Sequence, residues 1–393
     1  MGSARRALEG IRVLDVTQVM AGPFCAMQLC DMGADVIKVE PPEGDSTRRM
    51  AGATGTDSAA FNAVNRGKRG IVLDLRTREG QAALSRLAAG ADILIENYRP
   101  GVMARLGLDY PSLRGSCPRL IYASISGYGQ TGPDAAKGGF DLVAQGVSGL
   151  MSVTGEPGRP PVKIGVPITD LGAALFALAG ILAALHYRSR TGRGQHIDTS
   201  LVEAGVALSV WESAQYFGEG VTPGPMGSAH RLLAPYQAIR CADGYITLGA
   251  ANDRLFARLC ELIGHPEWVD RPEYGDATRR VRHRATLIAD IEAITSQHPR
   301  AHWLALFERA GLPSGPINDY PAVFSDPQIV ARQMVVPIEH PTLGRLQVPG
   351  TPVKMSDSPP EVRGRAPLLG EHTVEVLKEA GFSPEDITAL SSR

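Results

Sequence analysis

The sequence predicts an α/β protein: a large domain with a Rossmann-like parallel sheet, and a smaller α+β domain. Three observations lead to this fold class. Strand and helix patterns alternate from residue 11 to 129. A loop-rich stretch at 219–236 separates the first part of the chain from a region of short helices, and apolar residues make up 44% of the chain. Alternation of this kind is typical of a doubly wound sheet, in which ligands bind beyond the carboxyl ends of the strands.

The first βαβ unit is read from residues 11 to 40. IRVLDV (11–16) is a β-branched strand, residues 21–33 have helical apolar spacing with a stop at Gly33, and ADVIKVE (34–40) is the second strand. Such a unit requires parallel pairing and a right-handed crossover. The pattern then continues in a strand at 70–75, a helix at 78–89, a strand at 91–97, a helix opening after Arg99, and a strand at 119–129.

Two long helices, at 170–190 and 200–218, complete the first part of the large domain, which we place at 1–218. Short helices around one strand-like segment then predict a small α+β domain at 219–325. The remaining residues, 326–393, are rich in proline but carry strand-like segments and a polar helix. We expect this C-terminal segment to return to the large domain.

Composition limits the classes of partner and cofactor. A net charge of −1 without a broad basic segment predicts neither a nucleic-acid nor a membrane partner, and the apolar run 171–185 is short for a membrane span. Five cysteines without CxxC spacing indicate a reduced chain without disulfides, cytoplasmic or, in a eukaryote, of the mitochondrial matrix. Cys25 and Cys30 are expected to be small core residues. The sequence has no HExxH motif, and no metal is expected.

Asp170 is the most informative single residue. It follows a Gly/Pro-marked approach and precedes the uncharged run that begins at Leu171. An acid at that junction is typical of an N-cap or first-turn residue. It is equally the place for a carboxylate nucleophile beside apolar surface, which would form acyl intermediates. The local pattern leaves both interpretations open.

Four loops at strand ends have the composition of an anion or nucleotide site. The loop at 18–24 has only Gly22 and lacks the GxGxxG fingerprint of a dinucleotide site, which disfavours NAD there, and each loop alone also fits an ordinary turn. A cluster of Arg66, Lys68, Arg69 and Arg76 suits phosphate recognition, although a solvated charged turn is the alternative. Together the loops predict a phosphorylated, nucleotide-containing ligand. They are QVMAGPF (18–24), NRGKRGIVLDLR (65–76), ENYRPG (96–101) and SGYGQTGP (126–133) with the residues up to Asp141.

The chain resembles the class III CoA-transferases, the CaiB/BaiF-type family that includes formyl-CoA transferase. The resemblance runs in order from about residue 8 to 379. Within the family, GSAHRLLAPYQAI and VPITDLG are most similar to members that act on dicarboxylates, such as the glutarate type. The matching segments include LEGIRVLDVTQVMAGPF, GADVIKVEPPEGDSTR, NRGKRGIVLDL, ENYRPGVMARLGL, YASISGYGQTGP, GGFDLVAQGVSGL, TGRGQHID, GPIND and APLLGEHT.

The resemblance implies a reaction and a partner. Asp170 falls on the family's catalytic aspartate, whose carboxylate would attack an acyl-CoA thioester and pass through an aspartyl anhydride and an aspartyl-CoA thioester. Coenzyme A and acyl-CoA would be substrates, with no permanently bound cofactor. The second substrate would be a small carboxylic acid, expected to be a dicarboxylic one, with succinyl-CoA as the expected donor. A second copy of the chain would form an interlocked homodimer.

The family's binding residues carry over position by position. Two positions depart from the formyl-CoA transferase pattern: Met20 replaces a glutamine, and Asp141 replaces a glutamate near the active site. His230 and Arg231, in the loop at 227–231, are candidates for acceptor recognition together with Asp141. The implied CoA contacts are Met20, Ala21, Leu73, Asp74, Leu75, Arg76, Asn97, Tyr98, Arg99, Arg105, Lys137 and Phe140.

Two other functions compete with CoA transfer. A 2-methylacyl-CoA racemase needs an acid–base pair for the α-proton, and its relatives place a histidine in the motif that here reads GGFDLVAQ. No histidine occurs between positions 1 and 185, which counts against racemisation. A non-catalytic CoA-binding scaffold would have no need of Asp170.

Overall fold

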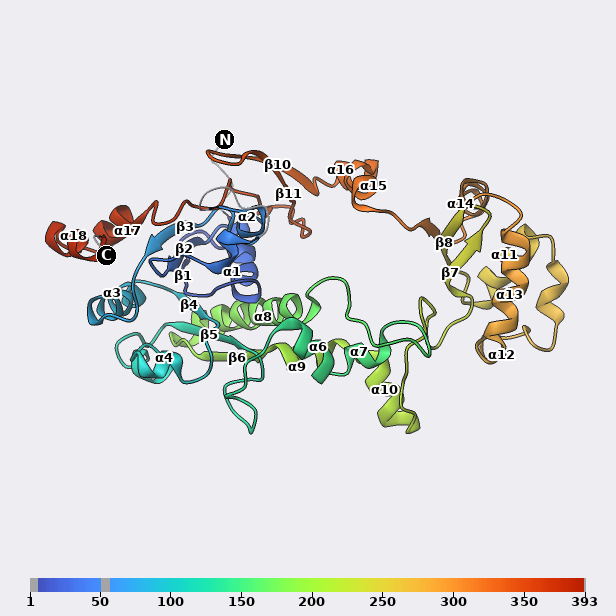
Figure 1. Ribbon diagram of the computed structural model, residues 1–393, viewed down its shortest axis with the longest axis horizontal. Coiled ribbons are helices and arrows are strands. Elements are labelled where there is room, and N and C mark those ends of the chain that lie inside the picture. Colours follow the sequence, from blue (N-terminus) through green and yellow to red (C-terminus); the bar gives the residue numbers. More distant parts are fainter. Residues whose placement is uncertain (1–5, 51–56, 392–393) are drawn as a thin grey trace. The chain divides into compact units, whose positions relative to one another are not determined.

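The computed structural model describes residues 6–50 and 57–391, which form two compact units (Figure 1). The first unit combines the segments up to Leu150, Lys163–Ala214 and the C-terminal segment from Pro327. The second combines Met151–Val162 and Gln215–Asp326. The sequence placed the corresponding boundaries at 218 and 325, and did not separate 151–162 from the large domain.

The first unit contains a six-stranded sheet in the order β3-β2-β1-β4-β5-β6, with every neighbouring pair parallel. Five of these strands lie where alternation predicted them. The sixth, β6, was not expected, because HIDTS is short, polar and only partly buried. The strands are β1 (Arg12–Asp15), β2 (Asp35–Glu40), β3 (Arg69–Val72), β4 (Ile93–Glu96), β5 (Ile121–Ser126) and β6 (His196–Ser200).

The strand order reverses between β1 and β4. The chain moves outward from β1 to β2 and β3, then returns to β4 on the other side of β1 and continues to β6. In a sheet of this kind the loops after the two central strands diverge to opposite faces and leave a crevice at their carboxyl ends. This crevice is the expected place for a ligand.

Helices cover both faces of the sheet (Figure 1). Alternate side chains of each strand point to opposite faces, and both sets are buried. One face packs against α1 (Ala21–Asp31) and α8 (Ile168–Thr191). The other packs against α3 (Arg78–Ala89), α4 (Val102–Arg105), α5 (Tyr110–Leu113), α17 (Thr373–Glu379) and α18 (Pro384–Ser391). Cys25 and Cys30 lie fully buried on α1, which confirms their core role.

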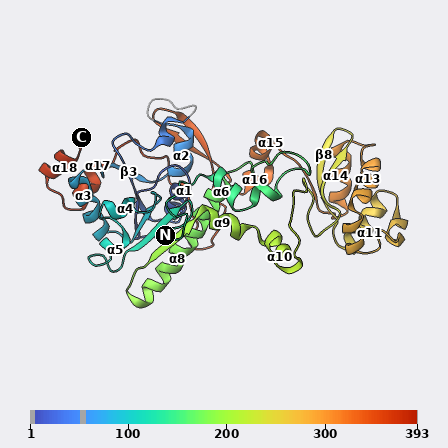
Figure 2. The ribbon, with the colours of Figure 1, turned by 60° about the horizontal axis from the view of Figure 1, so that its bottom comes forward.

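Helix α8 is longer than the apolar run indicated. It has 24 residues, and by length and composition it could cross a membrane. In this fold, however, α8 packs on β5, β6, α1 and α9 (Leu201–Leu208), so one side of the helix is core (Figure 2). Gly172 permits the close approach, because a Cβ there would lie 3.0 Å from Leu208 and 3.4 Å from Ala204.

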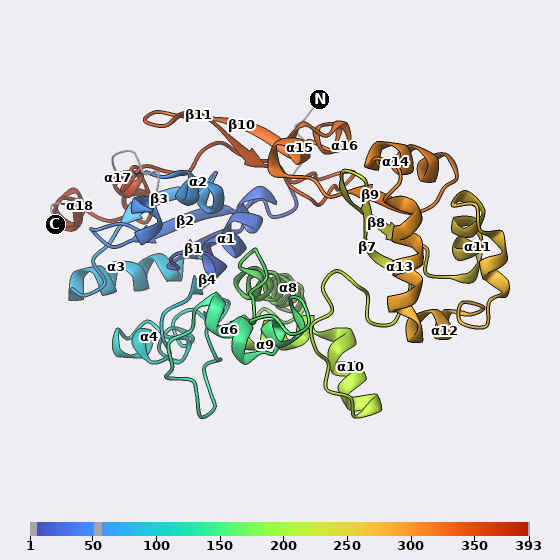
Figure 3. The same ribbon diagram turned by 45° about the vertical axis from the view of Figure 1, so that its right-hand side comes forward.

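The helix expected at 200–218 is two helices. The chain leaves helical geometry at Ser209, which separates α9 from α10 (Val210–Glu219). Ser200 caps α9: its hydroxyl oxygen accepts a hydrogen bond from the Glu203 N–H at 3.2 Å, and the hydroxyl donates to the Glu203 carboxylate at 2.7 Å. Figure 3 shows α6 (Asp141–Val147) and α9 beside α8, and all three pairs are in contact.

The C-terminal segment packs on the first unit. Arg69 on β3 forms ion pairs with Glu375 and Glu379 of α17, both at 2.8 Å. The strand-like sequences form an antiparallel hairpin that contacts α2. The elements are η1 (Ser46–Arg49), α2 (Ala59–Asn65), α7 (Leu150–Val153), α16 (Pro327–Ala331), β10 (Val335–His340) and β11 (Gly344–Pro349).

The second unit has its own core around a small antiparallel sheet, β7-β8-β9. Buried Phe256, Trp268, Trp303 and Phe307 pack the helices against that sheet. The elements are β7 (Tyr236–Cys241), β8 (Gly244–Gly249), α11 (Asp253–Leu262), η2 (Pro266–Asp270), α12 (Ala277–Arg282), α13 (Arg284–Thr295), α14 (Arg300–Arg309), β9 (Ser314–Pro316) and α15 (Tyr320–Ser325).

Candidate active site

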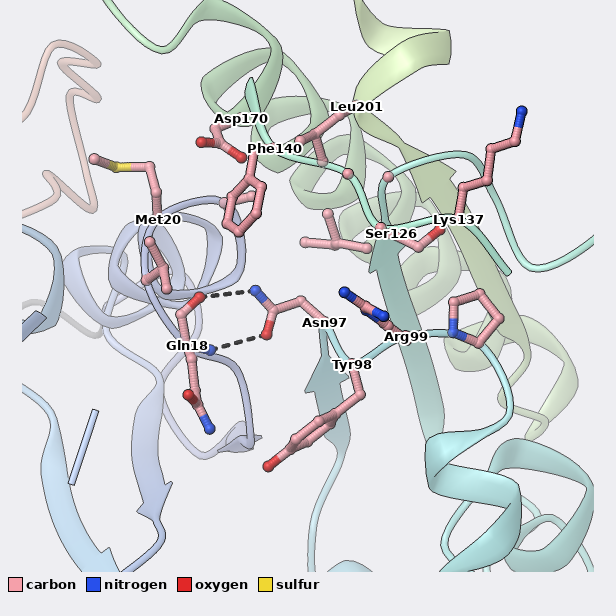
Figure 4. A pocket seen from close by; sticks show the side chains of 17 residues that line it. Gln18, Met20, Asn97, Tyr98, Arg99, Ser126, Lys137, Phe140, Asp170 and Leu201 are labelled. Carbon is pink, nitrogen blue, oxygen red and sulfur yellow. Dashed lines mark hydrogen bonds between the residues drawn. The ribbon is translucent and has the colours of Figure 1, made fainter. Parts of the chain in front are cut away.

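A cavity of about 320 Å³ lies at the β1/β4 crevice of the first unit (Figure 4). The loops after β1, β4 and β5 form its walls, and the first turns of α8 and α9 complete it. The lining residues are Gln18, Val19, Met20, Ala21, Asn97, Tyr98, Arg99, Pro100, Ile125, Ser126, Gly127, Lys137, Gly138, Gly139, Phe140, Asp170 and Leu201.

Two hydrogen bonds join the loops that follow β1 and β4. The Gln18 N–H donates to Asn97 Oδ1 at 2.9 Å, and Asn97 Nδ2 donates to the Gln18 carbonyl at 2.8 Å (Figure 4). One asparagine side chain thus pairs with the backbone of the opposite loop as a strand would. The pairing fixes the spacing of the two loops across the crevice.

The side chains of buried Lys38 and Asp45 form hydrogen bonds with the backbone of the loop after β1. Lys38 Nζ donates to the Thr17 carbonyl at 2.6 Å and to Asp45 at 3.1 Å. Asp45 in turn accepts from the Val19 N–H at 3.2 Å. Val19 has φ +71°, a left-handed conformation that is costly for a β-branched residue. The surrounding hydrogen bonds impose this conformation on the cavity wall.

The phosphate interpretation of the 65–76 cluster is wrong for its buried members. Arg66 and Lys68 lie inside the unit, where they pair with Asp31 at 2.6 Å and Asp15 at 2.7 Å. Arg69 pairs with Asp35 instead. Arg66 and Lys68 neutralise carboxylates of α1 and β1 that are distant in sequence, so neither a phosphate nor solvent surrounds them.

Asp170 reaches the cavity from the first turn of α8 (Figure 4). Pro167 occupies the N-cap position, and within the described residues the Asp170 carboxylate has no hydrogen bond or ion pair. Asp170 therefore does not cap the helix. A first-turn position still gives the carboxylate a favourable interaction with the helix dipole.

The surroundings raise the pKa of Asp170 to about 6. Burial is the main cause, and the negative charge of Asp141 adds to it. At neutral pH the group is still mostly ionised, yet it is more basic than an ordinary aspartate. A half-buried carboxylate without partners, facing a cavity, has the properties of a nucleophile.

Seven of the twelve implied CoA contacts line this cavity. The Arg99 guanidinium has no hydrogen bond or ion pair among the described residues and is available to an anion. Lys137 pairs with Asp134 at 2.7 Å, and its amino group points away from the cavity in Figure 4. Phe140 is 74% exposed and lies beside Asp170 in the same view. The seven are Met20, Ala21, Asn97, Tyr98, Arg99, Lys137 and Phe140.

The other five implied contacts lie outside the cavity. Leu73 is buried in the core beneath the sheet. Asp74 forms a double hydrogen bond with Arg76, through Nε at 2.8 Å and Nη2 at 3.0 Å. Leu75 packs at the edge of the same core, and Arg105 is the last residue of α4.

The acceptor candidates are divided between the two units. Asp141 is the first residue of α6, and Thr169 and Gln145 donate hydrogen bonds to its carboxylate. His230 and Arg231 belong to the second unit. His230 Nδ1 accepts from the Leu232 N–H at 3.1 Å, and Arg231 donates to the Gly224 carbonyl at 2.8 Å.

Sequence reasoning named the loops that contain Gln18, Ser126 and Gly139 but did not single these residues out as contacts, and it missed Leu201 on α9. The abundance of glycine in this loop predicted an irregular shape, but it did not show that Gly127 and Gly139 in particular are required. A Cβ on Gly127 would lie 2.7 Å from the Gly139 Cα, so neither position tolerates a side chain without a backbone shift. The loop crossing behind the cavity needs both glycines.

Comparison with known proteins agrees with this geometry. The family model described as CoA-transferase family III matches residues 8–373. A succinyl-CoA:glutarate CoA-transferase of Homo sapiens is 41% identical over 376 residues, covering 95% of this chain and 86% of its own. A succinyl-CoA:mesaconate CoA-transferase of Haloarcula marismortui is 40% identical over 385 residues, covering 95% and 96%.

Among solved structures, a CAIB/BAIF family protein from Brucella suis matches with a TM-score of 0.85 and 40% identity, covering 95% of this chain and 99% of that one. The agreement therefore extends over both units and the C-terminal segment. With the family model, the curated relatives and this fold in accord, the chain belongs to CoA-transferase family III.

Proposed function

We propose that this enzyme moves CoA from succinyl-CoA to a small dicarboxylic acid, with Asp170 as the nucleophile. One observation carries the proposal: a carboxylate faces the crevice cavity that a guanidinium also lines, and neither group has a partner among the described residues. Relatives named for glutarate, mesaconate and oxalate support small diacids as the acceptor class.

The first half-reaction cleaves the donor thioester. The Asp170 carboxylate attacks the acyl carbon and expels CoA thiolate, which gives a mixed anhydride of Asp170 with the donor acid. The thiolate then attacks the Asp170 carbonyl of that anhydride and releases the donor carboxylate. Asp170 now carries CoA as a thioester, and the enzyme is ready for the second acid.

The second half-reaction repeats these steps in reverse order. The acceptor carboxylate attacks the Asp170 thioester and expels CoA thiolate, leaving a new anhydride. The thiolate attacks the acceptor carbonyl, and the Asp170 carboxylate leaves unchanged. Every intermediate is sensitive to hydrolysis, so water must be excluded while the exchange proceeds.

The cavity residues have matching tasks in this proposal. Arg99 binds a CoA phosphate or a substrate carboxylate, Met20 and Phe140 flank the acyl group with apolar surface, and Asn97 and Tyr98 contact the CoA chain. Asp74, Leu75, Arg76 and Arg105 contact the nucleotide portion, whereas the Leu73 side chain supports them from the core. His230 with Arg231 recognises the far carboxylate of the acceptor. CoA is a substrate here and not a resident cofactor.

The active enzyme is an interlocked homodimer in this proposal. Apolar residues on α6, α8 and α9 remain exposed in the single chain, which supports a second copy as their cover. They include Leu142, Val143, Val147, Leu175, Phe176, Val206 and Leu208. Five buried free cysteines support a reducing, cytoplasmic location.

Racemisation of 2-methylacyl-CoA remains the competing function. It requires an acid–base pair at the α-carbon, and among the described residues the cavity lining contains no histidine. Asp170 and Asp141 are both acids, and Asp141 is occupied by protein donors. This chemistry favours acyl transfer.

An acyl-exchange screen tests the proposal. Purified enzyme is mixed with succinyl-CoA and a panel of mono- and dicarboxylic acids, and new CoA esters are identified by mass spectrometry beside Asp170→Ala. We expect a dicarboxyl-CoA that is absent with the variant. No exchange with any acid, together with solvent deuterium entering a 2-methylacyl-CoA, would establish the racemase instead.

A further inference from the structure

Helix α8 has no cap of its own, although it carries Asp170. Pro167 at the N-cap has no side-chain acceptor. The missing acceptor comes from α6: Asp141 Oδ1 accepts from the Thr169 N–H at 2.9 Å and from the Thr169 hydroxyl at 2.7 Å. Thr169 is fully buried and directly precedes Asp170. The first turn of α8 is therefore held by a residue 28 positions earlier in the chain.

Gln145 completes a hydrogen-bonded set of Asp141, Gln145, Thr169 and Ile164, called the bracket below. It lies fully buried one turn after Asp141 on α6, and its Nε2 donates to Asp141 Oδ2 at 2.7 Å. Its Oε1 accepts from the Ile164 N–H at 2.8 Å. Both oxygens of Asp141 are thereby used, and the approach to α8 is tied at Ile164 as well as at Thr169.

The bracket also acts on the charge of Asp170. The negative charge of Asp141 raises the pKa of Asp170 beyond what burial causes. A neutral cap would supply the hydrogen bond to Thr169 without this effect. A carboxylate at 141 both fixes the turn and keeps Asp170 basic.

We propose that Asp141 is a positioning residue for the transfer reaction: with Gln145 it fixes the first turn of α8 and so holds the Asp170 carboxylate in the cavity. This role replaces substrate recognition by Asp141, and it rests on the proposed function of Asp170. Asp141 acts on the reacting carboxylate through Thr169 and the helix, and through its negative charge.

The hydrogen-bond pattern predicts which substitutions fail and which succeed. Asp141→Asn places an amide group against the Gln145 amide, and every orientation of the two leaves a pair of donors facing each other. Adding Gln145→Glu restores a full set: the new amide at 141 accepts from Thr169 and donates to position 145, whose carboxylate accepts from Ile164. The double variant keeps the bracket and moves its charge.

Steady-state kinetics of acyl exchange test the proposal. We expect Asp141→Asn to lower kcat about ten- to hundred-fold with little change in the KM for acyl-CoA, since misplacement of a reacting group acts on the chemical step. We expect D141N/Q145E to recover at least about tenfold of that loss. Asp319→Asn, which removes the same charge from the cap of α15, is the matched control and should leave kcat unchanged.

Hydrogen–deuterium exchange of a peptide spanning 163–175 supplies a readout independent of activity. Exchange at the start of α8 should accelerate in Asp141→Asn and return to the wild-type rate in D141N/Q145E. Unchanged exchange in Asp141→Asn, or a kcat loss that the double variant does not recover, would overturn the bracket. Absence of any acyl transfer by the wild-type enzyme would refute the proposed function, while the exchange data would still decide the bracket.

Discussion

At the scale of a single residue, the burial that makes the Asp170 carboxylate more basic also lowers the stability of the folded protein. Its pKa of about 6 lies above the ordinary 3.8 because burial disfavours the charged form. The unfolded chain therefore loses this proton at lower pH than the folded one. The resulting penalty appears as pH rises above about 4 and is complete above about 6.

We expect Asp170→Asn to abolish acyl exchange and to stabilise the protein at pH 7.5. The gain should be about 1–2 kcal/mol, allowing for the partial exposure of the side chain to solvent. Urea unfolding at pH 7.5 and at pH 3.5 measures it, and the gain should vanish at the lower pH. Equal stability of the two proteins at pH 7.5 would contradict the raised pKa.

The same pKa sets the pH dependence of the reaction. Only the ionised carboxylate is nucleophilic, so kcat/KM should fall about tenfold per pH unit below an apparent pKa near 6. A pH–rate profile between pH 5 and 8 at constant ionic strength measures this. A profile flat down to pH 5 would show that an ordinary aspartate limits the rate.

At the scale of the elements, the β1 loop depends on a buried ion pair. Lys68 donates to Asp15 at 2.7 Å and to the Pro23 carbonyl at 2.9 Å, with both side chains fully enclosed. Lys68→Met should destabilise the first unit by about 3–5 kcal/mol, because it leaves the buried Asp15 charge without its cation, with only the hydrogen bonds from Thr17. Urea unfolding provides the measurement.

Two further variants make that experiment decisive. Asp15→Asn combined with Lys68→Met removes both charges and should recover part of the lost stability. Arg345→Met, which breaks the exposed pair with Glu339, should change stability by less than about 0.5 kcal/mol. Equal effects of Lys68→Met and Arg345→Met would contradict the enclosed pair.

The close approach of the Gly127 and Gly139 backbones also fixes the position of a loop beside the cavity. A methyl group on Gly127 would overlap the Gly139 backbone, so Gly127→Ala should displace the loop from Lys137 to Phe140. We expect the KM for acyl-CoA to rise about tenfold, since a shift of about 1 Å in a binding group has effects of this size. Gly115→Ala, where a Cβ meets open space, is the matched control.

At the scale of the whole molecule, apolar residues on α8 and α9 are exposed in the single chain, where the proposed dimer would cover them. Leu175 on α8 and Val206 on α9 are each about half exposed, on helices that pack together. The combination Leu175→Asp and Val206→Asp should convert the proposed dimer to monomers, because it would bury charges at the proposed interface. Sedimentation velocity at several concentrations measures the mass. Val374→Asp on α17, equally exposed but distant in the fold, should leave the dimer intact.

The elements of the first unit could be predicted because their signals are local. Period-two and period-3.6 patterns identify β1 through β5 and the helices α1, α3 and α8 within a few residues. The β6 strand was missed because HIDTS has no strand-like pattern of its own and is a strand only through its pairing with β5, in which Tyr122 opposes His196. The break between α9 and α10 at Ser209 has no glycine or proline to announce it.

The sequence alone determined the fold class, the family resemblance and the position of Asp170 at the start of a helix. Only the tertiary structure decided that Asp141 caps that helix, that Lys68 and Arg66 are buried with carboxylates, and that Asn97 joins two loops at the crevice. The physical reason is separation along the chain. Propensity and periodicity act over a few residues, whereas these contacts join residues 28 to 79 positions apart.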